Sequence, residues 1–161
     1  MGLFSKLFKG PEPDMEKSAT NEKKVRALFN QVVENGKEYR LIVGYTEDVK
    51  RFNYGFVHGS KTQIGNLIVG WNEDTKTIVV VPTVPDLSGC GDPTYYRREE
   101  ILKAYRNKYP TDAFIIYPNR KEYIGINAYE WLEDESLYIY LYQKEELEAF
   151  TAFFQNEFST K

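Results

Sequence analysis

The stretch QIGNLIVGWNEDTKTIVVVP, residues 63–82, carries the strongest structural signal in this chain. Two apolar runs, residues 63–71 and 76–82, flank a polar four-residue connection at 72–75. Strand-like runs on either side of a short polar turn predict a β-hairpin. Residues 78–81 are all aliphatic, which is typical of a strand that is buried on both faces. The sequence therefore predicts an antiparallel hairpin in the interior.

Five further segments have the composition of strands. They are residues 40–45, 52–57, 113–117, 122–128 and 137–142. Consecutive strands joined by short turns favour antiparallel pairing. We therefore expect a single, mostly antiparallel sheet of about six to seven strands.

Three segments have helical periodicity. The first, residues 20–35, has Thr20 or Asn21 as its cap and ends at Asn35-Gly36, where glycine suits left-handed backbone. The last covers residues 144–158, with one apolar side made by Leu147, Phe150, Thr151, Phe154 and Phe158.

A third helix is predicted between these two. Asp92 is a suitable N-cap and Pro93 suits the first helical position. The expected buried side of this helix consists of Ile101, Leu102, Tyr105 and Tyr109. The predicted fold class is thus α+β, with the three helices on one face of the sheet. The alternative is a barrel like that of pleckstrin homology domains, capped by the last helix.

The chain divides into residues 1–17, an amphipathic peptide with a linker, and residues 18–161, a single α+β domain. Leu3, Phe4, Leu7 and Phe8 have the spacing of an apolar helical stripe, and lysines lie beside them. Such a peptide suits peripheral membrane or partner contact through residues 1–9. The alternative is a frayed terminus or one docked on the domain.

Composition limits the classes of function. The net charge is −3, so the basic footprint of a nucleic-acid binder is missing, and we expect no nucleic-acid partner. Aromatic residues make up 16% of the chain, which argues against disorder. With one cysteine, no secretory signal and no long apolar run, we expect a soluble cytoplasmic protein.

Residues 83–98 contain the best candidates for chemistry. Cys90 lies between two glycines before the predicted helix, where a thiol can become a nucleophile. The nearby carboxylates Asp86 and Asp92 would raise the thiol pKa, and the only histidine is His58. Arg97 and Arg98 could bind an anion at the helix start.

No ligand motif supports a metal site or a cofactor, and we expect neither.

Aromatic alternation is the most informative pattern. In residues 137–142, Tyr138, Tyr140 and Tyr142 would share one face of a strand, opposite the aliphatic residues. Phe52, Tyr54 and Phe56 alternate in the same way. Such aromatic faces suit an interface, although cross-strand pairing within the sheet would also explain them.

The resulting hypothesis is a non-enzymatic interaction or binding module that uses a tyrosine-rich sheet face to engage a protein partner or a second copy of itself. The alternative is a small enzyme, or a protein that binds an anion or small molecule, with its pocket at residues 83–98.

Overall fold

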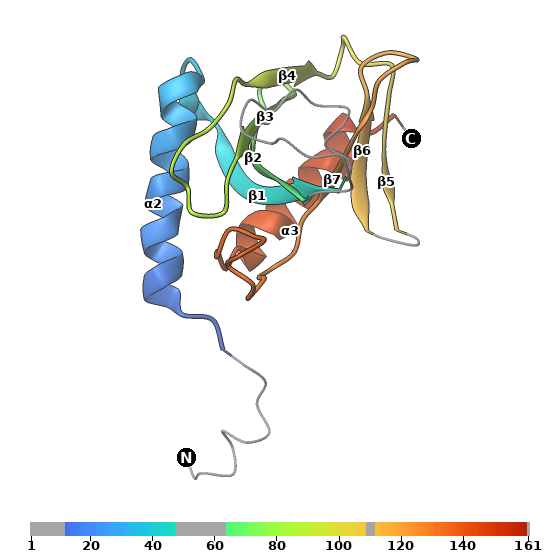
Figure 1. Ribbon diagram of the computed structural model, residues 1–161. Coiled ribbons are helices and arrows are strands. Elements are labelled where there is room, and N and C mark those ends of the chain that lie inside the picture. Colours follow the sequence, from blue (N-terminus) through green and yellow to red (C-terminus); the bar gives the residue numbers. More distant parts are fainter. Residues whose placement is uncertain (1–11, 48–63, 109–111, 161) are drawn as a thin grey trace.

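The computed structural model describes residues 12–47, 64–108 and 112–160. Seven strands form one sheet in the order β4-β3-β2-β1-β7-β6-β5, and all the pairings recorded between them are antiparallel (Figure 1). The strands are β1 (Arg40–Thr46), β2 (Gly65–Asn72), β3 (Thr77–Thr83), β4 (Thr94–Arg97), β5 (Lys103–Asn107), β6 (Ala113–Tyr117) and β7 (Ile124–Asn127). The helical elements are α2 (Met15–Val32), the short η1 (Gly36–Glu38), α3 (Lys144–Phe153) and its π-helical continuation η3 (Phe154–Phe158).

The predicted hairpin is confirmed as β2 and β3. The strands pair from Asn66↔Thr83 to Asn72↔Thr77. At the turn, the Asn72 side-chain oxygen accepts hydrogen bonds from the backbone N–H groups of Asp74 and Thr75, at 2.9 and 3.1 Å. Every residue of β2 is buried, so this hairpin needs cover on both of its faces.

That cover comes from two helices on opposite faces of the sheet (Figure 1). On one face, α3 and η3 pack against side chains from all seven strands, including Trp71 and Phe114. On the other face, α2 packs Val25 and Phe29 over β1, β2 and β3. The expectation that the helices share one face is therefore wrong, because the aliphatic runs of the hairpin leave apolar side chains on both sides.

The prediction of a helix that starts at Asp92 is wrong. Residues 94–97 and 103–107 are β4 and β5, the two outer strands of the sheet. Tyr96 and Ala104 are buried in the core under α3, whereas Leu102 is 54% exposed. The Asp-Pro capping signal was overridden because strand pairing with β3 and β6 buries alternate residues instead. Tyr109 lies outside the described residues.

The prediction of a strand at residues 137–142 is also wrong, since this segment has neither helical nor strand geometry. Ile139, Tyr140 and Leu141 are buried one after another, and Leu137 is 44% exposed. Three successive buried residues are incompatible with strict alternation between two faces of a strand. The segment is instead a strap that runs beside α2, and its Ile139 and Leu141 side chains join the core on that side.

The barrel alternative is not supported, since within the described residues the sheet is open, with β4 and β5 as its outer strands. The predicted strand at 52–57 lies outside the described residues. The last helix is confirmed: Phe150, Phe154 and Phe158 are fully buried against the sheet.

The first helix begins five residues earlier than Thr20, because the Asp14 side chain accepts hydrogen bonds from the N–H groups of Glu16 and Lys17, both at 3.1 Å. After the helix, Asn35 rather than Gly36 adopts the left-handed conformation, with φ of 57°.

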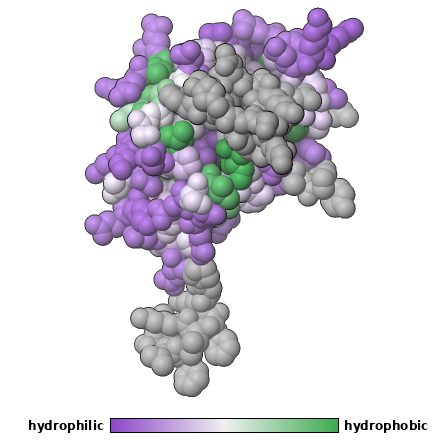
Figure 2. Space-filling view, in the orientation of Figure 1, coloured by the Kyte–Doolittle hydropathy of each residue, from purple (hydrophilic) through white to green (hydrophobic). Residues whose placement is uncertain are grey.

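Hydrophilic residues dominate the described part of the surface shown in Figure 2, and hydrophobic ones gather in small patches near its middle. None of the helices within the described ranges combines the length and the apolar character needed to cross a membrane.

Candidate functional site

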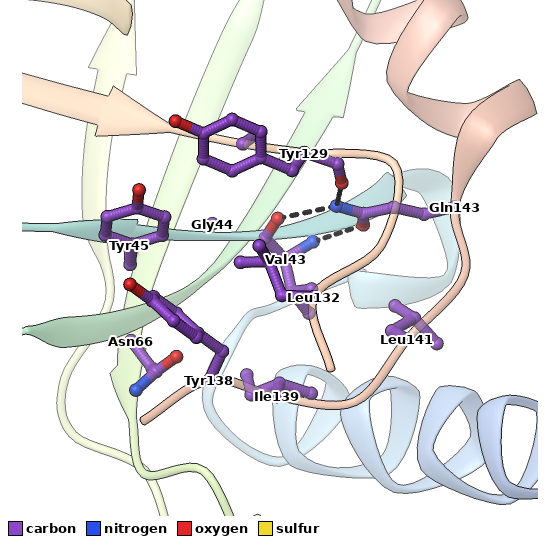
Figure 3. A pocket seen from close by; sticks show the side chains of 11 residues that line it. Val43, Gly44, Tyr45, Asn66, Tyr129, Leu132, Tyr138, Ile139, Leu141 and Gln143 are labelled. Carbon is purple, nitrogen blue, oxygen red and sulfur yellow. Dashed lines mark hydrogen bonds between the residues drawn. The ribbon is translucent and has the colours of Figure 1, made fainter. Parts of the chain in front are cut away.

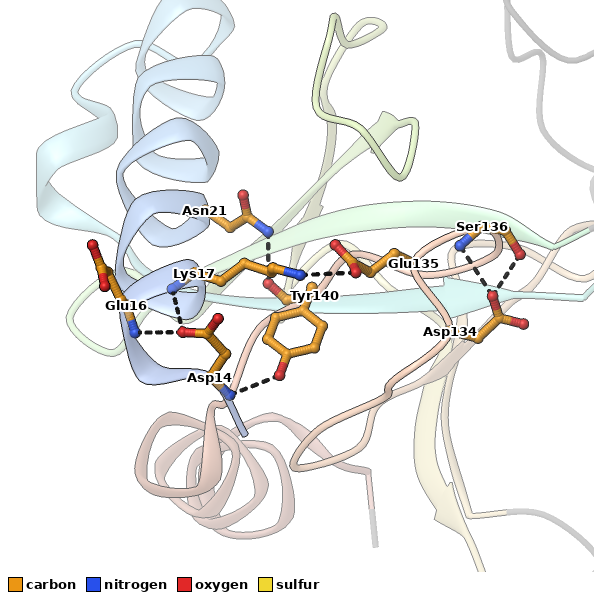
Figure 4. A network of polar contacts seen from close by, with 8 residues as sticks. All are labelled: Asp14, Glu16, Lys17, Asn21, Asp134, Glu135, Ser136 and Tyr140. Atoms are coloured by element: carbon orange, nitrogen blue, oxygen red, sulfur yellow. Dashed lines mark hydrogen bonds and ion pairs between the residues drawn. The ribbon is translucent and has the colours of Figure 1, made fainter. Parts of the chain in front are cut away.

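The three tyrosines predicted to form a ladder are divided among different environments. Tyr140 is 8% exposed and holds the strap to the start of α2 (Figure 4). Its hydroxyl accepts a hydrogen bond from the Asp14 N–H at 2.7 Å, and its carbonyl accepts one from the Asn21 side chain at 2.9 Å. Lys17 lies above its ring, 4.9 Å from the centroid. Tyr140 therefore has a structural role, and its ring is not available as a contact surface.

Tyr142 is tied to the same helix, because its backbone N–H donates to the Ser18 hydroxyl at 2.9 Å. Tyr138 instead packs against Tyr45, with ring centroids 4.9 Å apart, and Tyr45 also stacks on Tyr129 at 6.0 Å. Burial, followed by hydrogen bonding with Tyr129, raises the pKa of Tyr45. These rings form one wall of a small cavity (Figure 3).

The cavity has a volume of about 20 Å³, which is room for a single water molecule. Gln143 closes its other side (Figure 3). The side chain of Gln143 bonds to Val43 through both its oxygen and its nitrogen, at 2.8 and 2.9 Å, and to the Tyr129 carbonyl at 2.8 Å. A space of this size cannot hold a substrate, so we interpret this cluster as structural.

Phe52, Tyr54, Phe56 and His58 lie outside the described residues. The prediction of an aromatic face there stays a prediction.

Cys90 is half-buried beside α2, and its thiol lies 3.9 Å from the Leu28 carbonyl oxygen. Burial raises the pKa of the thiol, and the charge of Asp92 adds to this effect. The expected helix start, which would have lowered the pKa, is not formed. This environment disfavours the thiolate that nucleophilic chemistry requires.

Arg97 and Arg98 are not at a helix start either. Arg97 belongs to β4, lies over the Tyr95 ring at 5.4 Å from the centroid, and pairs with Glu100 at 3.7 Å. The Arg98 N–H donates to the Lys76 carbonyl at 3.0 Å, which continues the pairing of β3 with β4. The anion site predicted from helix N–H groups therefore loses its main donors.

A different group of tyrosines lies on the sheet. Tyr105 of β5 and Tyr117 of β6 stack with centroids 6.4 Å apart, and Tyr123, just before β7, lies 5.3 Å from Tyr117. We call Tyr105, Tyr117 and Tyr123 the tyrosine cluster. Lys103 extends over two of its rings, 4.9 Å from the Tyr105 centroid and 5.8 Å from that of Tyr117.

The tyrosine cluster lies on the sheet face opposite α3. Strand alternation places Tyr105 and Tyr117 there, because the neighbouring Ala104 and Ile116 point into the core under α3. The α2 helix packs over β1 to β3 and not over this half of the sheet (Figure 1). All three tyrosines are partly exposed. Partly exposed tyrosines on the face of a sheet are well suited to protein contacts.

The outer side of β5 adjoins the tyrosine cluster. β5 is the last strand of the sheet, and a groove of about 450 Å³ runs beside it. The described residues that line the groove are Lys103, Tyr105, Arg106, Lys108, Gln155, Ser159 and Thr160. Three of these are basic and none is acidic.

Arg106 is held in place by Asp112 through two hydrogen bonds of 2.8 and 2.6 Å. It also lies over the Phe114 ring, 5.5 Å from the centroid. Lys103 and Lys108 are exposed. The edge strand therefore carries a positive charge next to aromatic surface, and we regard β5 with the tyrosine cluster as the candidate binding site.

Sequence patterns did not reveal this site, because helical periodicity assigned Tyr105 to the buried side of a helix. The signal that could have located it is the alternation in Lys103-Ala104-Tyr105-Arg106-Asn107, where a small apolar residue separates longer amphipathic ones.

Comparisons with known proteins do not identify a family. The sequence matches no protein-family model, and no curated protein matches it. Within residues 12–47, 64–108 and 112–160, no group of three or more acidic, histidine or cysteine side chains could hold a metal ion. The function must therefore be inferred from the geometry of the site alone.

Proposed function

We propose that this protein is a non-enzymatic interaction module that binds an extended, acidic segment of a partner protein along β5, next to the tyrosine cluster. The observation that carries the proposal is the combination of an outer strand with three basic groove-lining residues. An extended peptide can add to such an edge through backbone hydrogen bonds, and side-chain contacts then provide specificity.

Charge favours a partner protein over a second copy of the chain. Pairing β5 with β5 of another copy would bring the exposed Lys103 and Lys108 of both copies into one small interface, whereas the charge of Arg106 is paired with Asp112. Like charges on facing strands are destabilising, and lysines on edge strands commonly prevent self-pairing. An acidic segment has the complementary charge, and Tyr105 provides apolar contact area beside it.

The alternative function, an enzyme or small-molecule site at residues 83–98, gains no support from the structure. Its anion site depended on a helix that is replaced by β4, and the environment of Cys90 raises the thiol pKa.

The test is binding of a short fluorescent peptide of alternating glutamate and valine, followed by anisotropy and by NMR of the protein. We expect the largest shifts at the amides of β5, and we expect Lys103→Glu to weaken binding roughly tenfold. Lys37→Glu is the matched control, because Lys37 is also exposed but lies in η1. Equal weakening by both variants, or shifts centred elsewhere, would contradict the proposal.

A further inference from the structure

Thr160 lies against the outer edge of β5. Its backbone N–H donates a hydrogen bond to the Ala104 carbonyl at 2.8 Å. Its hydroxyl oxygen lies 3.2 Å from the Ala104 nitrogen, from which it accepts a hydrogen bond, and 3.0 Å from the Ala104 carbonyl oxygen. One residue thus satisfies both backbone groups of Ala104.

These are the groups that an added strand would use. In an antiparallel pair, opposite residues exchange an N–H and a C=O, and every second residue of a strand points its backbone groups to the same side. Because the backbone N–H and C=O of Ala104 bond to Thr160, these groups face away from β6. The backbone groups of Arg106, two residues further on, have the same orientation. Thr160 imitates a strand residue, with its hydroxyl in place of a backbone carbonyl.

The chain reaches this position directly from the helix. Ser159 follows η3 in an extended conformation, with φ of −65° and ψ of 153°. The Ser159 N–H donates to the Phe154 carbonyl at 2.7 Å. The hydrogen bonds to Ala104 are therefore made by Thr160, two residues after η3 ends at Phe158, so they can break while η3 stays packed on the sheet.

We infer that Thr160 is a displaceable plug on the binding edge, which a partner strand must remove before it can pair with Ala104. This inference rests on the proposed function, since it concerns the same edge. Ala104 and Arg106 both point their backbone N–H and C=O groups to the outer side of β5. With Thr160 in place, the groups of Ala104 are occupied, and a partner strand can pair with those of Arg106. The plug thus lowers the affinity of the edge for short or poorly matched segments and selects longer ones.

Three substitutions separate the contributions of the plug. Thr160→Ser keeps the hydroxyl and the N–H, Thr160→Ala removes the hydroxyl, and Thr160→Pro removes both. Proline is compatible with the extended Ser159 that precedes it. We expect the affinity for the glutamate–valine peptide to rise about threefold for the alanine variant and roughly tenfold for the proline variant, because net hydrogen bonds of this kind are modest. The serine variant should bind like the wild type.

Hydrogen exchange at the Ala104 amide gives an independent readout in the same proteins. Exchange should accelerate in the alanine and proline variants and stay slow in the serine variant. If the peptide binds at β5 with the same affinity in all four proteins, the plug is refuted while the proposed function stands. If the peptide binds none of them at β5, the proposed function fails and the inference fails with it.

Discussion

The side-chain amide of Gln143 forms hydrogen bonds with both backbone groups of Val43. The Val43 N–H donates to the amide oxygen at 2.8 Å, and the amide nitrogen donates to the Val43 carbonyl at 2.9 Å. Gln143 is 6% exposed and also bonds to the Tyr129 carbonyl. In this way a side chain takes the place of a neighbouring strand at the middle of β1.

Replacing Gln143 by alanine should therefore destabilise the protein. The substitution leaves the buried Val43 N–H and C=O, and the partly buried Tyr129 carbonyl, without this partner, and the two buried losses are the costly ones. We expect a decrease of about 3 kcal/mol in the free energy of unfolding, measured by urea denaturation. Gln31→Ala, on the exposed side of α2, should change it by less than about 0.5 kcal/mol. Equal effects would show that the amide pairing contributes nothing.

Gly70 provides a second test of packing. A side chain at Gly70 would collide with the ring of Phe29, which is fully buried between α2 and the sheet. Gly70→Ala should lower the free energy of unfolding by about 2 kcal/mol, because the fully buried ring would have to shift. Gly89→Ala is the control, since a Cβ at Gly89 would meet no atom within 4 Å beyond its own chain neighbours. A stable Gly70→Ala protein would mean that α2 is not tightly packed there.

Alkaline titration tests the burial of two tyrosines. Burial is the main cause of the raised pKa of both Tyr45 and Tyr96. Both groups should still be neutral in the folded protein when most tyrosines ionise near pH 10. Below about pH 10 both tyrosines are neutral in the folded and in the unfolded chain, so the stabilising contribution of their burial is complete. Above about pH 10 the tyrosines of the unfolded chain ionise while the buried ones stay neutral, so this contribution is lost as the pH rises.

The measurement is tyrosinate absorbance against pH, together with urea unfolding at each pH. The free energy of unfolding should fall above about pH 10 in the wild type and fall less steeply in Tyr45→Phe. Complete ionisation of all tyrosines in one step, without unfolding, would contradict the buried environments.

Cys90 should react slowly. With its pKa raised by burial and by Asp92, the thiol has little thiolate at neutral pH. We expect alkylation by iodoacetamide at pH 7 to be severalfold slower in the folded protein than in denaturant. Faster reaction in the folded state would instead support the alternative function at residues 83–98.

Sequence patterns predicted the elements whose signal is local and strong. The hairpin of β2 and β3, the strand β1 and the last helix follow from long apolar runs and clear helical periodicity. At residues 92–109 the prediction was wrong, because a good capping pair and the tyrosines at 105 and 109 imitate a helix. Pairing with β3 and β6 outweighs that local preference, and no single-sequence pattern reveals such distant partners.

The candidate site was not predicted from the sequence. A tyrosine-rich sheet surface was expected at residues 137–142, and one occurs at Tyr105, Tyr117 and Tyr123. Tyrosines and aliphatics do alternate in the sequence of residues 137–142, but the backbone of this segment bonds to side chains of α2 and not to a strand. The role of Gln143 could not have been anticipated, because it depends on contacts 100 residues away in sequence.

Among the described residues, β1 and β7 pair backbone to backbone only at Tyr45 and Asn127, whereas β1 and β2 pair along seven positions. The sheet therefore consists of two halves, β4-β3-β2-β1 and β7-β6-β5, which are joined by a short stretch of pairing between β1 and β7. The phenylalanines of α3 and η3 pack against both halves. We therefore expect the two halves to depend on this aromatic layer, as well as on the single backbone pair between β1 and β7, to stay together. Separation of the two halves would expose the facing edges of β1 and β7 before either half unfolds.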